Sequence, residues 1–203
     1  MKRSISSAFL LCLLILGSCS ETPKKKEPQK PPEPVTGRFA LFQMFNAGRG
    51  WAPDIQVLRL NSIHLPELKA EPGKAAAWEA RFVSPGSSRA RTYTYSAIEA
   101  PGNLHKGVFA GLEESWSGSR GSVTQPFLIA AVKTDSDEVY RTALKKAADY
   151  EKKNPGKTIS FILEHNNRFP DPAWRVIWGE SAGSSNFSIF VDASTGEYLA
   201  TQR

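Results

Sequence analysis

One short stretch of the sequence has residue types that suggest a catalytic serine. Residues 179–183 read GESAG and match the pattern G-x-S-x-G, in which small residues let a serine stand on a sharp turn between a strand and a helix. A serine exposed in this way can attack an ester carbonyl when a histidine acts as its base. The pattern raises the hypothesis of a serine esterase that acts through Ser181.

The surroundings of Ser181 argue against that hypothesis. Residues 184–191 (SSNFSIFV) read as a strand, whereas the turn requires a helix directly after the serine. We therefore interpret residues 179–183 as a Gly/Ser hairpin loop, equivalent to residues 84–88 earlier in the chain.

The three histidines supply neither a base for Ser181 nor a metal site. The histidine that serves such a serine follows it in the chain, but His64, His105 and His165 all precede Ser181. They lie in separate segments without the spacing of metal ligands. We expect no catalytic residue, no metal and no cofactor, and predict that the protein is not an enzyme.

The N-terminus predicts export and a lipid anchor. Lys2 and Arg3 precede an apolar stretch, residues 8–16, that is too short to span a bilayer. Residues 16–19 (LGSC) resemble the lipobox of bacterial lipoproteins. This resemblance implies cleavage before Cys19 and a diacylglyceryl group, with acyl chains such as palmitate, on that residue. An ordinary secretory signal or an N-terminal membrane anchor is the alternative.

These features divide the N-terminal part of the chain into a lipoprotein signal peptide, residues 1–18, and a linker, residues 19–36. Five of the 17 residues from 20 to 36 are proline, which favours an extended tether over a folded segment. We expect the body on the extracytoplasmic side of the cell envelope. Ser20, rather than aspartate, follows Cys19, which favours the outer membrane if the cell has one.

The net charge points away from nucleic acid. The chain carries +6, and removal of Lys2 and Arg3 with the signal peptide leaves +4, dispersed along the sequence. Nucleic-acid binding needs a concentrated basic patch, so we expect no nucleic-acid partner. The membrane is an expected partner through the lipid anchor, with the lysines of the linker facing solvent.

The rest of the sequence looks like two copies of one unit. An offset of 96 residues places Trp78 on Trp174 and Tyr93 on Ile189 without a gap. Each copy reads as a helix followed by three strands. Trp78 and Trp174 occupy the same position of an alternating strand, so we predict that both are buried.

Two helices are expected, one in each copy. Residues 38–52 are predicted to be helical with an apolar face formed by Phe39, Phe42, Phe45 and Ala52. The second helix begins after Asp135, which can cap it, and its predicted inward residues are Val139, Ala143, Ala147 and Tyr150.

Residues 100–133 have no counterpart at the end of the second copy. Within them, 107–111 and 113–117 read as short strands, and 126–132 (PFLIAAV) reads as an apolar strand. We expect this insert to join the sheets of the two copies.

Residues 172–176 (PAWRV) and 191–197 (VDASTGE) resemble the PepSY domain. The resemblance implies an α+β fold of two tandem PepSY-like units, each a helix packed on a small antiparallel sheet, over residues 37–133 and 134–203. The first unit lacks the terminal turn. The resemblance also implies a non-catalytic binding or inhibitory role, with an envelope protein or peptide as partner. A purely structural envelope lipoprotein is the other non-catalytic alternative.

Trp116 is the residue that the repeat accounts for least. It lies in a polar segment, residues 113–118 (EESWSG), without a counterpart in the PepSY pattern. Aromatic side chains bury large areas in cores and interfaces alike, so Trp116 is either a core residue or a contact residue. It is our candidate binding residue.

Overall fold

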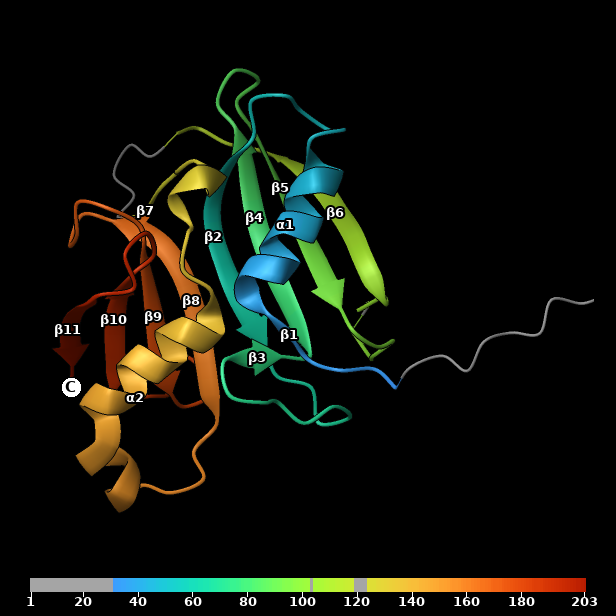
Figure 1. Ribbon diagram of the computed structural model, residues 1–203. Helices are drawn as coiled ribbons and strands as arrows, with labels where there is room; N and C mark the ends of the chain where they lie inside the picture. The colour runs from blue at the N-terminus through green and yellow to red at the C-terminus, as the bar shows by residue number, and fades with distance from the viewer. Residues whose placement is uncertain (1–30, 103, 119–123) are drawn as a thin grey trace, which may run out of the picture. The chain divides into compact units, whose positions relative to one another are not determined.

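The computed structural model describes residues 31–102, 104–118 and 124–203 of the chain. Residues 32–203 form one compact α+β unit in which two helices cover one face of a single antiparallel sheet (Figure 1). The α+β class predicted from the sequence is confirmed, because every ladder between strands of this sheet is antiparallel.

The first half of this unit has one helix and four strands of the main sheet. The helix is shorter than predicted, and the fourth strand is a single element where two short strands were expected. The elements are α1 (Gly37–Gly48), β2 (Gln56–Ile63), β4 (Ala77–Ser84), β5 (Arg89–Ser96) and β6 (Gly107–Ser115), with β1 (Val35–Thr36) pairing with β3 (Lys74–Ala75) as a separate two-stranded sheet.

The second half repeats this order with a longer helix and a shorter last strand. Its elements are α2 (Ser136–Lys153), β8 (Ile159–Asn166), β9 (Ala173–Trp178), β10 (Ser188–Asp192) and β11 (Tyr198–Gln202). Four strands thus follow each helix, not the three predicted.

The strands run in the order β11-β10-β9-β8-β2-β4-β5-β6, so β2 and β8 join the two halves directly at the centre. The expectation that residues 100–133 join the sheets of the two copies is therefore only partly right, because β2 and β8 pair directly and residues 124–127 add bonds to both strands. The expectation that the insert lacks a counterpart is wrong for β6. β6 extends β5 at one edge as β11 extends β10 at the other. In place of the apolar strand predicted at 126–132, β7 (Thr124–Gln125) pairs with β8 and a 3₁₀ turn, η1 (Ile129–Ala131), follows.

The cross-strand register has the same 96-residue offset as the sequence. Ala80 pairs with Tyr93 between β4 and β5, and Val176 pairs with Ile189 between β9 and β10. Because side chains alternate across a strand, this register turns the corresponding residues of the two hairpins toward the helices.

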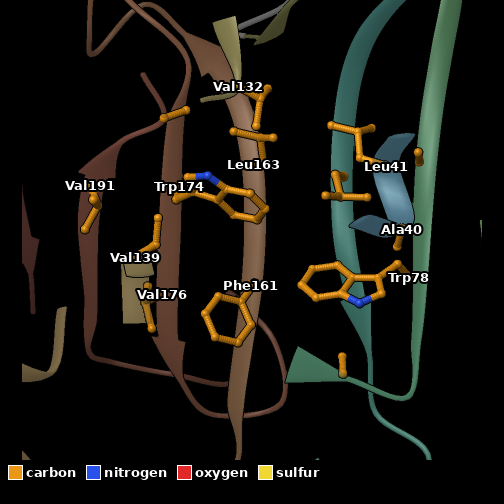
Figure 2. Close-up of a cluster of buried hydrophobic side chains, with 14 of the residues drawn as sticks. Ala40, Leu41, Trp78, Val132, Val139, Phe161, Leu163, Trp174, Val176 and Val191 are labelled. Carbon is orange, nitrogen blue, oxygen red and sulfur yellow. The ribbon is translucent and has the colours of Figure 1, made fainter. Parts of the chain in front are cut away.

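Two tryptophans lie at the middle of the core, as Figure 2 shows. Trp78 and Trp174 are fully buried, which confirms that prediction, and their rings meet edge to face with centroids 6.4 Å apart. Gly37 lies directly above them, since a Cβ there would come within 2.7 Å of Trp174 and 2.9 Å of Trp78. Only a residue without a side chain lets α1 begin this close to the pair.

The predicted helix face is correct for α2 and only partly correct for the first helix, where Ala52 is buried and Phe45 packs against the core. In α2 the predicted Val139, Ala143 and Ala147 are buried. In α1 the buried residues are instead Gly37, Ala40, Leu41, Met44 and Gly48. Phe39, which was placed on the inner face, has 45% of its surface exposed. Leu41 and Met44 fill the middle of this inner face, whereas Gly37 and Gly48 lie where the helix comes closest to bulky side chains.

The N-termini of α1 and α2 meet at one carboxylate. Asp135 accepts hydrogen bonds from the backbone N–H of Ser136 (2.7 Å), the backbone N–H of Arg38 (2.9 Å) and the Thr36 hydroxyl (2.7 Å). The predicted cap of the second helix is therefore also a cap for the first. A carboxylate is favourable here because the positive ends of both helix dipoles point at it.

Candidate binding face of the sheet

The face of the sheet turned away from α1 and α2 is called the open face here. Along β4, Trp78, Ala80 and Phe82 are fully buried against the helices. Glu79 and Arg81 alternate with them and point to the open face, where both are half-buried. The sequence placed these two side chains outward correctly but gave no signal that they border a hollow.

An open hollow of about 480 Å³ lies on this face over the first half of the sheet. Side chains from β2, β4 and β5 form its floor, and the segments that follow β6 and include β7 form its wall. The lining residues are Leu58, Arg59, Asn61, Glu79, Arg81, Thr92, Trp116, Gly118 and Thr124.

Ion pairs hold the arginines of the hollow in place. Arg81 forms an ion pair with Glu114 of β6 at 2.7 Å, and Arg59 lies 3.8 Å from Glu164 of β8. These pairs are partly exposed, so each is worth little to stability, but together they keep planar guanidinium groups on the floor.

Two polar groups at the hollow have no partner among the residues that the structure describes. The buried Nε of Arg81 has no hydrogen-bond acceptor within the described residues, and Glu79 takes part in none of the ion pairs formed by that part of the chain. Buried polar groups are normally hydrogen-bonded. The hollow therefore offers the Glu79 carboxylate to a ligand, whereas the Nε of Arg81 is buried beneath its surface.

Trp116 stands in the wall of this hollow. Its side chain is half-buried, and its backbone N–H donates to the carbonyl of Ser88 at 2.9 Å, which fixes the segment after β6 against the β4–β5 turn. It is absent from the central core, whereas Trp78, Trp174 and Trp178 are core residues. The position fits a contact residue, and the binding role assigned to Trp116 stays a prediction.

The other half of the open face is closed by its own side chains. The guanidinium groups of Arg168 and Arg175 lie over the ring of Phe190, at 4.5 Å and 5.4 Å from its centroid. The Nε of Arg175 also donates to the Ser188 hydroxyl at 3.0 Å. Burial is the main cause that lowers the pKa of Arg175 from its ordinary value. This stack occupies the surface that the first half leaves free.

The residues around Ser181 form a polar loop between β9 and β10. The Ser181 hydroxyl lies 2.9 Å from the Ser184 hydroxyl, and the two residues exchange further backbone bonds. The next regular element is the strand β10, as the sequence predicts, and not the helix that a nucleophile elbow needs.

The three histidines occupy separate places. His64 follows β2, His165 lies in β8, and the Nδ1 of His105 is 3.3 Å from Glu99. In the part of the chain that the structure describes, no three His, Cys, Asp or Glu side chains gather as a metal site would require.

Cys19, the predicted site of lipid attachment, lies outside the described residues. Within residues 31–102, 104–118 and 124–203, neither helix has the length and apolar character needed to cross a membrane.

The fold has a counterpart among solved structures. No family model matches the chain, and neither does any curated protein. The crystal structure of a "putative lipoprotein" from Clostridium difficile 630 is similar with a TM-score of 0.52 and 12% sequence identity. The match covers 86% of this chain and 95% of that one. At this identity the likeness concerns the fold.

Proposed function

We propose that the protein is a lipid-anchored, extracytoplasmic module of the cell envelope that binds a protein or peptide partner and performs no catalysis. The observation that carries the proposal is the hollow around Trp116, which is bordered by this aromatic side chain, by the Arg81 guanidinium and by the Glu79 carboxylate, which forms no ion pair within the described residues. Binding requires only such a surface. Catalysis would require a nucleophile, a base and a site for developing charge within mutual reach.

The membrane anchor is the second part of the proposal. The lipobox-like sequence before Cys19 motivates it, and the lipoprotein description of the similar Clostridium difficile structure supports it. The linker would then hold the folded body away from the bilayer surface. We place the protein on the outer membrane where the cell has one, because Ser20 follows the cysteine.

We further infer that the two halves are tandem PepSY-like units. The support is the repeated order of one helix and four strands, together with the shared 96-residue register of the β4–β5 and β9–β10 hairpins. The resemblance favours a binding or inhibitory contact with another envelope protein.

Site-directed photo-crosslinking tests the binding proposal. A photoreactive phenylalanine analogue replaces Trp116 in the full, membrane-anchored chain, and a matched variant carries it at Lys152, an exposed position of α2. We expect a defined adduct from position 116 that is absent from position 152. Equal labelling from both positions, or none from either, would contradict a specific partner at the hollow.

A second measurement separates binding from catalysis. Hydrolysis of short acyl esters by the wild type that disappears in Ser181→Ala, with folding intact, would favour the esterase instead.

Intact-mass analysis of the membrane fraction should show cleavage before Cys19 with added acyl mass. Membrane association that persists in Cys19→Ala would refute the lipid anchor.

A further inference from the structure

The central strands β2 and β8 separate at one end, and a segment of the chain fills the space between them. There β7 pairs with Asn166 and His165 of β8. Two residues further on, Phe127 exchanges two backbone hydrogen bonds with Val57 of β2, at 2.9 Å and 2.8 Å. Phe127 is buried in the main core. The chain thus inserts an extended segment, residues 124–127, with one aromatic side chain pointing inward.

At the opposite end the same two strands separate again. Their pairing stops at Asn61 and Ile162. The next N–H of β8 that faces β2, that of Phe161, donates to the side chain of Ser62 rather than to a backbone carbonyl. Beyond it lies a hollow of about 280 Å³, called the slot here, with His64, Lys69, Glu71, Tyr140, Lys157 and Ile159 among its lining residues. Figure 1 shows the 64–73 loop at the end of the sheet away from β7.

The slot lies where the internal repeat would place a second inserted segment. Ser62 pairs with Trp78 and Leu163 pairs with Trp174, so β2 and β8 correspond with an offset of 101 residues. Val57 and His165, which receive the inserted segment, then correspond to Thr158 and His64. Both of these residues line the slot.

The floor of the slot has the apolar character that a buried side chain needs. The two helices begin at Gly37 and Ser136, so they correspond with an offset of 99 residues. This offset places Leu41 on Tyr140. Leu41 is fully buried, whereas Tyr140 and Ile159 are only partly buried against the core. The slot therefore leaves apolar surface uncovered.

Backbone groups of β8 also point into the slot. The carbonyl of Thr158 accepts from Gly179 toward β9, while the N–H of Phe161 points toward β2. Because these directions alternate along an antiparallel strand, the N–H and C=O of Ile159 point into the slot. Thr158, the counterpart of Val57, is bonded to β9, so an added strand would pair with the neighbouring residue, Ile159, one position away from the exact counterpart of Val57.

The rim of the slot is basic. Lys69 and Lys157 line it, and the Nζ of Lys157 also donates to the Tyr150 hydroxyl at 3.1 Å. The acidic residue of the lining, Glu71, is bonded to Lys74 at 2.7 Å. The protein's own linker would be a poor occupant, because residues 20–30 carry four lysines and no aromatic side chain. The complementary occupant is acidic and carries a bulky apolar residue.

We propose that the slot binds an extended segment of another protein, by strand addition to Ile159, with an aromatic residue on Tyr140 and acidic residues near Lys69 and Lys157. Residues 124–127 show the geometry of such an insertion within the same molecule. This site is separate from the hollow at Trp116 and stands or falls independently of it.

Fluorescence anisotropy with the full chain in detergent tests the proposal. The probe is a labelled peptide, Glu-Glu-Thr-Gln-Pro-Phe-Glu-Glu, which places the residues of 124–127 between glutamates. We expect saturable binding, weakened at least about tenfold by Lys69→Glu with Lys157→Glu, and by replacing the peptide's Phe with Ala. Lys152→Glu, on the exposed side of α2, and Trp116→Ala should leave the affinity unchanged.

Amide hydrogen exchange supplies a readout specific to strand addition. The peptide should slow exchange at Ile159. The proposal would be overturned by absence of binding, by an affinity that is unchanged in the variant with both lysines replaced by glutamate, or by binding without protection of Ile159. A gain in affinity on deleting residues 20–30 would identify the linker as the occupant and also overturn it. Loss of photo-crosslinking at position 116 would leave the slot untouched, so the two sites fail separately.

Discussion

The two halves of the sheet share the same anchor for their helices. The indole N–H of Trp78 donates to the carbonyl of Val35 at 3.0 Å, and that of Trp174 donates to the carbonyl of Thr134 at 3.2 Å. Each acceptor lies two residues before the first residue of a helix. In both halves a buried tryptophan therefore ties a strand to the start of the helix above it.

The halves differ away from this shared centre. The first half ends in a nine-residue strand, β6, and leaves a hollow on the open face, whereas the second half ends in the five-residue β11 and closes its face with arginines over Phe190. Residues 124–127 fill one end of the β2–β8 gap, and the slot stays open at the other. The repeated elements build the core and the floors of both proposed binding surfaces. The segments that differ between the halves decide which parts of these floors stay open.

Replacing either tryptophan tests most strongly whether the two halves share one core. Trp78→Ala and Trp174→Ala should each cost about 3–5 kcal/mol of unfolding free energy, because both remove a large, fully buried side chain. Chemical denaturation measures both values. Since the rings touch, the double variant should lose less than the sum of the single losses. A cost below about 1 kcal/mol for either one would show that the halves do not share their core.

Gly37 tests how closely α1 must approach the pair. Gly37→Ala should cost about 1–3 kcal/mol, because the new Cβ would overlap two rigid indole rings. Gly50→Ala is the matched control, since the nearest atom to a Cβ there is the Ala47 carbonyl oxygen at 3.5 Å. Equal thermal stability of the two variants would mean that the helix shifts freely over the tryptophans.

Asp135 tests whether the halves are coupled through their helix starts. Asp135→Ala should cost about 2 kcal/mol, the upper range for an N-cap, because the carboxylate serves both helices. Asp137→Ala should cost less, since Asp137 bonds only within the first turns of α2. Amide exchange should speed up at the start of α1 as well as α2 in the first variant. Acceleration confined to α2 would show that the cap is not shared.

The β4–β5 loop should make the stability of the protein sensitive to acid through its hydrogen bonds to Asp54. The Ser84 hydroxyl and the Gly86 N–H donate to Asp54 and hold the pKa of its carboxyl below the ordinary value. This contribution to stability is present above the unfolded pKa, about 3.9, and is lost as the pH falls through the folded value. Thermal unfolding midpoints should therefore fall further in acid for the wild type than for Asp54→Asn. Parallel curves would exclude the effect.

The sequence predicted the parts of the fold that depend on local pattern and on the repeat. The 96-residue offset found the tryptophan pair, and helical spacing found the buried face of α2. The face of α1 was missed in part because Phe39 is large and apolar, whereas the true inner face needs glycine at 37 and 48, against side chains that lie elsewhere in the sequence. No local signal marks that Gly37 must lie on two indole rings.

The candidate sites were harder to predict for the same reason. Trp116 was found because it had no place in the repeat, and Glu79 was placed outward by strand alternation. Their meeting with Arg59 at one hollow depends on the β2–β4 pairing, which no single segment encodes. The slot depends on where β2 and β8 separate, and it becomes recognisable only when Phe127 shows what fills the opposite end.

The pairing of β2 with β8 must form late during folding, because the two strands are far apart in the sequence. Leu60 pairs with Leu163, a residue made 103 positions later. Contacts of such long separation slow folding, because a long loop must close before the contact is gained. Until β8 exists, the inner edge of β2 is an unpaired strand that can pair with another copy of the chain. The nascent chain is therefore most prone to aggregate in the interval before residue 163 is in place.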